Sequence, residues 1–288
     1  MPNKQVLGTY GPGSNHWVGD GFPVRNLFPS NGVDGLSPFL MLDYAGPADF
    51  DPSNRPRGVG EHPHRGFETV TIALQGSVDH RDSAGNSGTI RPGDVQWMTA
   101  AAGVVHEEMH EREFTRTGGT FEMVQLWVNL PKAHKMSPPR YQGISRDQIP
   151  TVDLGAGASA RIIAGDLNGA VGPAKTFTPV NLFDLRLSAG SDVLVNLPSG
   201  HNAGVVLLRG NVLINGSTDL QGEARLAVLS VAGDSVALAA KEDSTILVLS
   251  GEPIDEPVAS YGPFVMNTQA ELRQAVEDYR AGRMGHLG

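Results

Sequence analysis

Apolar and polar residues alternate with a period of two along much of the chain, which is the pattern of half-buried β-strands. The clearest run in the first half is Thr69–Leu74, which is rich in β-branched residues and closes at Gly76. A second apolar run, Phe121–Val128, ends shortly before Pro131. We therefore predict short strands joined by tight turns.

The second half of the chain repeats this pattern. Leucine and phenylalanine alternate with polar residues around Phe183–Leu187, and comparable runs follow, separated by glycine-containing turns, at 193–197, 205–208, 212–214, 226–231 and 245–249. Residues 131–150 between the halves are rich in proline, as connections between domains often are. We predict two β domains, at residues 1–148 and 149–288.

A helical pattern is expected only near the end of the chain. Thr268 and Glu271 have the spacing of a capping box, and Gly282 lies where a helix would stop. Between them, apolar side chains recur at helical spacing, at Leu272, Val276 and Tyr279. We expect one amphipathic helix that ends the C-terminal domain and packs on the β-strands of the protein.

The composition favours the same all-β class. The 288 residues include 36 glycines and 20 prolines, while charged residues make up only 18%. Many turns and few charges are typical of β-sandwiches and β-barrels rather than helical bundles.

Charge and residue usage narrow the classes of function. The net charge of −9 and the lack of a lysine or arginine run argue against direct binding of nucleic acid. Without cysteine, the chain cannot form disulfides, thiolate metal sites or a cysteine nucleophile. There is no apolar stretch of about 18 residues and no apolar signal-peptide core, so we expect no membrane association and a cytoplasmic location.

Two histidines two residues apart are the first candidates for chemistry. Side chains at alternate positions of a strand share a face, so His62 and His64 would lie on one face with α-carbons about 6–7 Å apart. Both imidazoles could then reach one metal ion at about 2.0–2.2 Å. An isolated His-x-His is usually incidental in a β protein, so it needs support from elsewhere in the chain.

That support comes from a second pair with the same spacing. His106 and Glu108 would share a face of another strand, while Glu107 would point away into solvent. Two such strands in one barrel would present three imidazoles and one carboxylate. Nitrogen and oxygen donors without sulfur suit Fe(II), Mn(II), Ni(II), Cu(II) or Zn(II), and positions left open on the ion would make the site catalytic.

Other residues are assigned lesser roles. His110 lies about 13 Å along the strand from His106, too far for the same ion, and is expected at the rim or in a loop. Glu68 is expected to support the ligands or to form an internal ion pair. Gln125 and Trp127 are either pocket lining or core, and His201 is expected to be structural.

Several segments resemble the pirin family of the cupin superfamily. The resemblance lies in HPHRGFETVT (62–71), PGDVQWMTA (92–100), GVVHEEMH (103–110) and LWVNLP (126–131). It implies a bicupin, with two face-to-face jelly-roll β-barrels and a C-terminal helix. One divalent metal, Fe(II) first among the candidates, would be held in the N-terminal barrel by His62, His64, His106 and Glu108, and the C-terminal barrel would hold none.

The resemblance also implies two functions from different classes. The first is a metal-dependent dioxygenase of the pirin-like quercetinase type, which opens flavonol-like phenols with O₂. In it, Glu108 is the candidate base, because a ligating carboxylate can accept the proton of the substrate hydroxyl. The alternative is a non-catalytic metal- or redox-sensing regulator that binds a protein partner.

Overall fold

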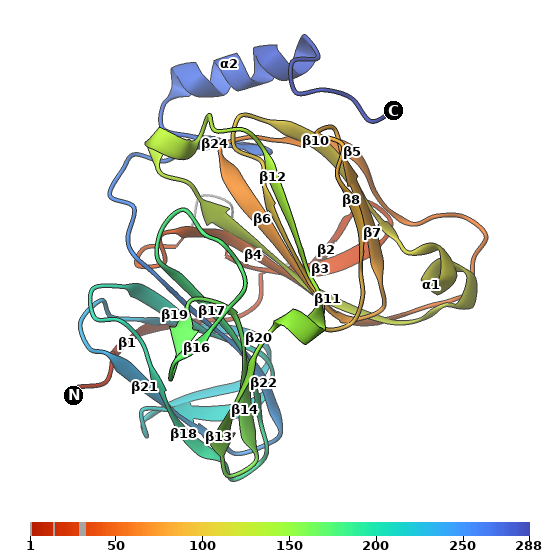
Figure 1. The fold of residues 1–288 in the computed structure, drawn as a ribbon. Coiled ribbons are helices and arrows are strands. Elements are labelled where there is room, and N and C mark those ends of the chain that lie inside the picture. The colour runs from red at the N-terminus through yellow and green to blue at the C-terminus, as the bar shows by residue number, and fades with distance from the viewer. Residues whose placement is uncertain (1, 14, 29–32) are drawn as a thin grey trace. The chain divides into compact units, whose positions relative to one another are not determined.

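The computed structural model describes residues 2–13, 15–28 and 33–288, and most of its regular secondary structure is β-strand (Figure 1). The expected all-β class with a helix near the C-terminus is therefore confirmed. The chain forms two compact units. The N-terminal unit comprises residues 39–146 and 254–288 with the described residues of 14–31, and the C-terminal unit comprises residues 147–253 with the described residues of 1–13 and 32–38.

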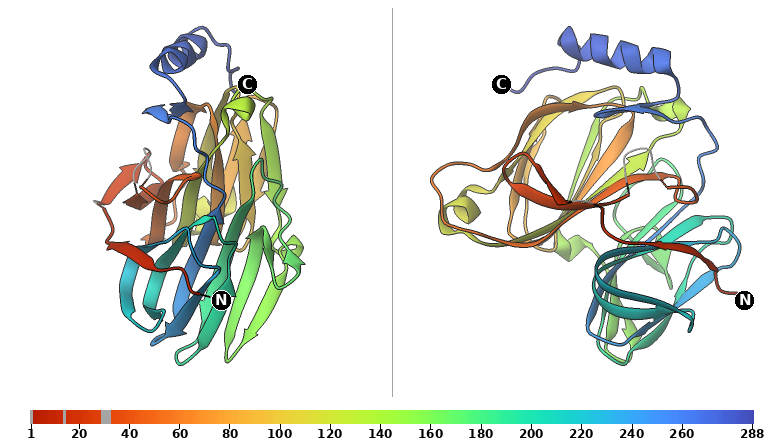
Figure 2. Two further views of the ribbon diagram at one scale, coloured as in Figure 1. Left: turned by 90° about the vertical axis from the view of Figure 1, so that its left-hand side faces the viewer. Right: turned by 180° about the vertical axis from the view of Figure 1, so that it is seen from behind.

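The chain changes units close to residue 148, but the division is not a single cut. Strand β1 (Val6–Tyr10) belongs to the C-terminal unit because it pairs with β20 (Thr218–Leu229), as Figure 2 shows. The last segment, 254–288, belongs to the N-terminal unit. The terminal helix thus lies in the N-terminal unit, not in the C-terminal domain as expected from its place in the sequence.

The C-terminal unit is one nine-stranded sheet with a small two-stranded ribbon. Its remaining strands are β13 (Thr151–Gly155), β14 (Ala158–Ala164), β15 (Asp166–Leu167), β16 (Ala170–Val171), β17 (Val180–Leu187), β18 (Asp192–Asn196), β19 (Asn202–Ile214), β21 (Ser235–Ala240) and β22 (Ser244–Gly251). Buried leucine, isoleucine, valine, alanine and phenylalanine side chains fill its core. His201 lies outside that core, and its Nδ1 is 3.1 Å from the Ser250 hydroxyl, in keeping with a structural role.

The strands of the N-terminal unit are divided mainly between two antiparallel sheets. The seven-stranded sheet contains β2 (Asn15–Val18), β3 (Phe22–Phe28), β4 (Phe39–Phe50), β6 (Phe67–Gln75), β9 (Val95–Thr99), β11 (Gly119–Asn129) and β12 (Arg140–Ile144). The four-stranded sheet contains β5 (Gly58–His64), β7 (Val78–Asp82), β8 (Ser87–Ile90) and β10 (Val104–His110). The order of the smaller sheet, β5-β10-β7-β8, places β10 in its interior.

The proline-rich segment after β11 is not a simple connection. It contains two 3₁₀ turns, Lys132–His134 and Arg146–Gln148, and between them β12 pairs with β9 at the edge of the larger sheet. A short helix, α1 (Arg112–Thr117), joins β10 to β11. Through β12, the proline-rich segment after β11 contributes to the fold of the N-terminal unit.

The final segment packs on the smaller sheet through β23 (Ala259–Tyr261), β24 (Phe264–Met266) and helix α2 (Gln269–Arg280) (Figure 1). The capping box is present: the Thr268 side chain accepts from the Glu271 amide, and the Glu271 side chain accepts from the Thr268 amide. Leu272 of the helix and Val105 of β10 belong to one buried apolar cluster. The amphipathic helix therefore covers the strand that carries the second predicted ligand pair.

In the described part of the chain, no helix combines the length and the apolar character needed to span a membrane.

Candidate metal centre

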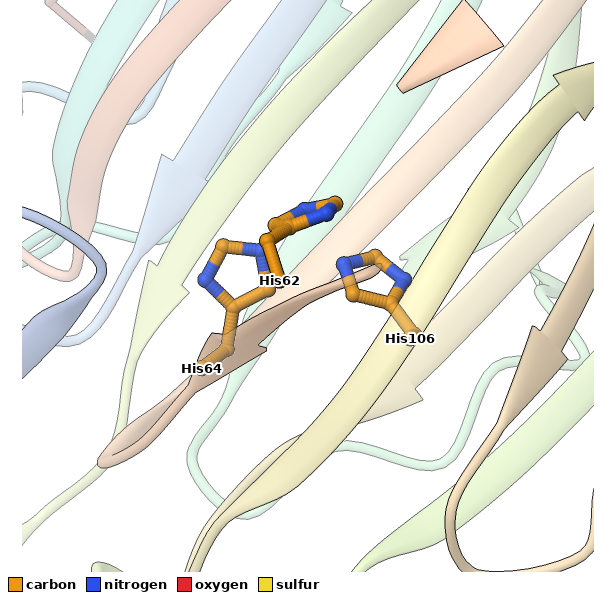
Figure 3. A group of neighbouring side chains, drawn as sticks. All are labelled: His62, His64 and His106. Carbon is orange, nitrogen blue, oxygen red and sulfur yellow. The ribbon is translucent and has the colours of Figure 1, made fainter. Parts of the chain in front are cut away.

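Neighbouring strands bring three histidines together. His62 and His64 lie on β5, and His106 lies on β10, where it is the direct cross-strand partner of His62. One ring nitrogen from each of the three can be chosen so that all lie within 4.8 Å of one another. Figure 3 shows the rings converging from the two strands.

The outer nitrogens of the β5 histidines have acceptors that fix their tautomers. His62 Nδ1 donates to the Gly60 carbonyl at 2.8 Å, and His64 Nδ1 approaches the Pro263 carbonyl at 3.4 Å. A carbonyl can only accept, so in neutral rings both Nε2 atoms keep a free lone pair.

His106 supplies the clearest sign of a bound ion. The residue is fully buried, and its Nε2 has no hydrogen-bond partner among the described residues. A buried polar atom without a partner costs free energy comparable to a lost hydrogen bond, so native proteins seldom leave one unexplained. A metal ion coordinated by the three histidines would satisfy it.

The electrostatic environment keeps two of the rings neutral. Burial, followed by the neighbouring His62, holds the pKa of both His64 and His106 well below the usual range. Only neutral imidazole has a lone pair for a metal. The three imidazoles, the unpartnered Nε2 and the low pKa values together fit a divalent transition metal.

Glu108 lies outside this three-histidine group. It is buried on the same face of β10 as His106, and its two carboxylate oxygens accept from Thr71 Oγ1 at 3.1 Å and Gln125 Nε2 at 2.8 Å. The role of Glu108 as the fourth ligand therefore remains a prediction.

Other buried polar groups of the N-terminal unit also lack a hydrogen-bond partner in the described part of the chain, and one of them contacts a histidine. Trp127 packs edge-on against His64, with ring centroids 5.4 Å apart. Its indole nitrogen, the Thr69 hydroxyl and the Gln96 amide have no hydrogen-bond partner among the described residues. Gln125 and Trp127 therefore lie beside the candidate site rather than in a purely apolar core.

The structure also places the residues with lesser predicted roles. Glu68 is buried, accepts from Thr99 Oγ1 at 2.6 Å and lies 3.6 Å from Arg140, which is the expected internal ion pair. Glu107 points away from the histidines and pairs with Arg81. The prediction for His110 was wrong: its ring is buried in an aromatic cluster, 4.7 Å from Phe121.

One buried histidine beside the site was missed. His80 on β7 approaches His106, with their Nδ1 atoms 3.4 Å apart, and its own Nε2 is 3.4 Å from Asp82. A signal was present in the sequence, because His80 and Asp82 alternate at the end of a strand that leads into the glycine-containing turn between β7 and β8. The spacing of His80 and Asp82 does not show that His80 approaches His106 on the neighbouring strand.

Comparisons with known proteins agree with the fold. The chain matches the family model Pirin over residues 21–128 and the Pirin C-terminal cupin domain over residues 182–285. It is 54% identical to a Pseudomonas aeruginosa protein named "Putative quercetin 2,3-dioxygenase", with 97% of this chain and 98% of that protein covered. A crystal structure of quercetin 2,3-dioxygenase from Acinetobacter baumannii matches with a TM-score of 0.97 and 51% identity over both full lengths.

A more distant comparison concerns a metal. The nickel(II) complex of a bacterial pirin from Escherichia coli shares the fold, with a TM-score of 0.63, 20% identity and coverage of 85% of this chain and 96% of that one. The two pirin family models together match both halves of the present chain. The chain therefore belongs to the pirin family.

Proposed function

We propose that this chain is a metal-dependent dioxygenase that opens flavonol-like phenols with O₂, using a divalent ion, Fe(II) first among the candidates, in the N-terminal unit. The observation that carries the proposal is the unpartnered Nε2 of buried His106, which faces two further histidines. The names of the similar proteins from Pseudomonas aeruginosa and Acinetobacter baumannii support the substrate class.

Glu108 is proposed as the fourth ligand. An ionised carboxylate offers about four lone-pair sites, and Thr71 and Gln125 account for only two of them. The remaining lone pairs stay available for an ion, while the two donors hold the carboxylate on the same face of β10 as His106.

Glu108 is also proposed as the base that takes the proton of the substrate hydroxyl. A bound divalent ion would supply Lewis acidity that lowers the pKa of a phenol beside it and would orient the substrate for oxygenation. The chain itself positions the reacting groups: Thr71 and Gln125 orient the base, and Trp127 offers an aromatic wall and an N–H donor beside His64.

Oxygen uptake with quercetin tests this function. Metal-free protein would be reconstituted separately with Fe(II), Mn(II), Ni(II), Cu(II) and Zn(II), and each sample compared with a Glu108→Ala variant of measured metal content. We expect metal-dependent uptake that falls by about 10²–10⁴-fold in the variant when its metal is retained, since a general base contributes on that order.

Glu107→Ala is the matched control, because this neighbouring carboxylate points away from the histidines and pairs with Arg81. It should leave oxygen uptake close to that of the unmodified protein. Tight metal binding without oxygen uptake for any of the five ions would contradict the dioxygenase proposal. A search for a protein partner that binds in only one metal oxidation state would then be the next step.

A further inference from the structure

Another buried histidine, His80, contacts the Nδ1 edge of the proposed metal ligand His106. His80 lies in the middle of β7, is 3% exposed, and is the cross-strand partner of Glu108. Its ring stacks on Tyr141, with centroids 5.1 Å apart and an interplanar angle of 18°. The tyrosine and the two strands hold the ring in place.

Asp82 anchors the far side of this ring. Its carboxylate accepts from the Ala84 and Asn86 amides at 2.9 and 3.0 Å and from the Asn86 side chain, so the β7–β8 hairpin turn fixes its position. Asp82 Oδ2 lies 3.4 Å from His80 Nε2. Burial acts to raise the pKa of Asp82, but hydrogen bonds from His80 and Asn86 outweigh it and the pKa is lowered. Because the Ala84 and Asn86 amides and the Asn86 side chain all donate to it, the carboxylate acts as an acceptor.

These contacts determine which nitrogen of each ring carries the proton. The Asp82 carboxylate requires a proton on His80 Nε2, and in a neutral ring this leaves His80 Nδ1 bare. That bare nitrogen faces His106 Nδ1 at 3.4 Å, so His106 Nδ1 must be the atom that carries a proton. His106 Nε2 is consequently deprotonated, with its lone pair directed toward His62 and His64.

The opposite polarity leaves a group unsatisfied. With the proton on His106 Nε2, that N–H would be buried without an acceptor among the described residues, and the two facing Nδ1 atoms would share no proton. A buried donor without an acceptor is destabilising. Only the arrangement that frees Nε2 makes both the His80–Asp82 and the His106–His80 hydrogen bonds, and it leaves on His106 a lone pair that a metal ion can take.

We infer that Asp82 and His80 are positioning residues, which form a carboxylate–histidine–histidine chain that fixes the tautomer and orientation of His106. The inference rests on the proposed metal site, but not on the substrate or on the oxygenation chemistry. Outer partners of metal-ligating histidines typically contribute about 10–100-fold to metal affinity.

The first test is the dissociation constant for Zn(II) alone, measured by competition with a chelator on the purified full chain. We expect His80→Leu to weaken binding about 10–100-fold. His80→Asn should bind Zn(II) more tightly than His80→Leu, because the Asn side-chain oxygen can take the place of Nδ1 as acceptor.

His110→Leu is the matched control for loss of a buried ring, since His110 contacts an aromatic cluster and not the three histidines. It should keep the Zn(II) affinity of the unmodified protein. Equal affinity in His80→Leu and the unmodified chain would overturn the inference, as would equal weakening by His80→Leu and His80→Asn.

The second test needs neither a variant nor a metal. Two-bond ¹H–¹⁵N correlation spectra of the metal-free chain with ¹⁵N-labelled histidine report which ring nitrogen carries the proton. We expect His106 as the Nδ1–H tautomer, and a His106 that is protonated on Nε2 would overturn the inference. Because neither readout involves oxygen or quercetin, a failure of the dioxygenase proposal would be separately visible.

Discussion

Arg65, the residue after the proposed ligand His64, donates from Nη1 to Asp278 Oδ2 of helix α2 at 2.7 Å. Its Nε also donates to the Ala102 carbonyl at 2.6 Å, just before the strand that carries His106. Arg65 is 4% exposed. One guanidinium thus connects the terminal helix to the ends of both strands that hold the three histidines.

Asp278→Asn should destabilise the metal-free protein by about 1–2 kcal/mol at pH 7, because it weakens charge-assisted hydrogen bonds to a buried arginine. Burial acts to raise the pKa of Asp278, but hydrogen bonds from Arg65, Gln274 and Arg283 outweigh it and lower the pKa to about 2. A carboxyl group with a depressed pKa stabilises the folded state fully at pH values above its pKa in the unfolded chain. This stabilisation is lost as the pH falls from about 4 to 2.

Urea denaturation at pH 7, 4 and 3 measures this difference. The difference in free energy of unfolding between the unmodified protein and Asp278→Asn should become smaller as the pH falls. Asp255→Asn, at an exposed carboxylate of the same segment, should show little change. A gap for Asp278→Asn that does not depend on pH would contradict the proposed role of the ion pair.

A second pH dependence, at alkaline pH, is expected from Lys135. Its ammonium is buried and donates to the Gly66 and Val265 carbonyls and to Asn129 Oδ1, and burial lowers its pKa to about 8. Between about pH 8 and 10 the unfolded chain binds more protons than the folded chain, so the free energy of unfolding should rise with pH. From a reference pKa of 10.5, the full rise would be up to about 3 kcal/mol.

Tyr141 sets the upper end of the pH range over which the free energy of unfolding should rise. Burial raises its pKa to about 12, so above about pH 10 the unfolded chain loses this proton first and stability falls. Denaturation between pH 7 and 10 should show the rise in the unmodified protein and not in Lys135→Met. A flat profile in the unmodified protein would contradict the assignment.

Gly66 separates the ligand-bearing strand β5 from β6. It has a φ of +89°, and a Cβ built there would lie 1.9 Å from the Val265 carbonyl oxygen. Gly66→Ala should therefore destabilise the protein by about 3–5 kcal/mol, at the severe end of single substitutions. Gly85 has a similar φ of +88° but open space around it, so Gly85→Ala should cost only the backbone strain of about 1–2 kcal/mol. Similar denaturation midpoints for the two variants would show that the close approach at Gly66 is not limiting.

Gln125 donates to the Glu108 carboxylate at 2.8 Å, so Gln125→Leu should leave that carboxylate less well oriented. We expect Zn(II) affinity or quercetin turnover to fall about 10-fold or more, as for other groups that orient metal ligands. Thr71→Val removes the other donor and should act in the same direction. Unchanged affinity and turnover in both variants would argue against Glu108 as a ligand or base.

The three-histidine cluster could be approached from sequence because its geometry is mostly local. Alternation along a strand placed His62 and His64 on one face, and the same rule paired His106 with Glu108. The terminal helix was also readable, since the capping box at Thr268 and Glu271 is a local signal. Such features depend on residues only two to four positions apart.

The remaining features depend on pairings across long stretches of chain. Pairing of Val6 with Leu229 assigns the first strand to the C-terminal unit, and nothing local to either strand specifies that partner. The approach of His80 to His106 likewise follows from the β7–β10 ladder. The donors from Thr71 and Gln125 to Glu108 arise between the two sheets, where alternation gives the face of a side chain but not its partner.

The central claim is that one metal ion lies among His62, His64 and His106. The most direct measurement is an anomalous difference map from crystals of the Fe(II)-loaded protein, with data collected on both sides of the iron absorption edge. We predict one strong peak in the N-terminal unit, at bonding distance from Nε2 of all three histidines and from one oxygen of Glu108. A map without a peak at the three histidines, or with its iron bound elsewhere, would contradict the claim.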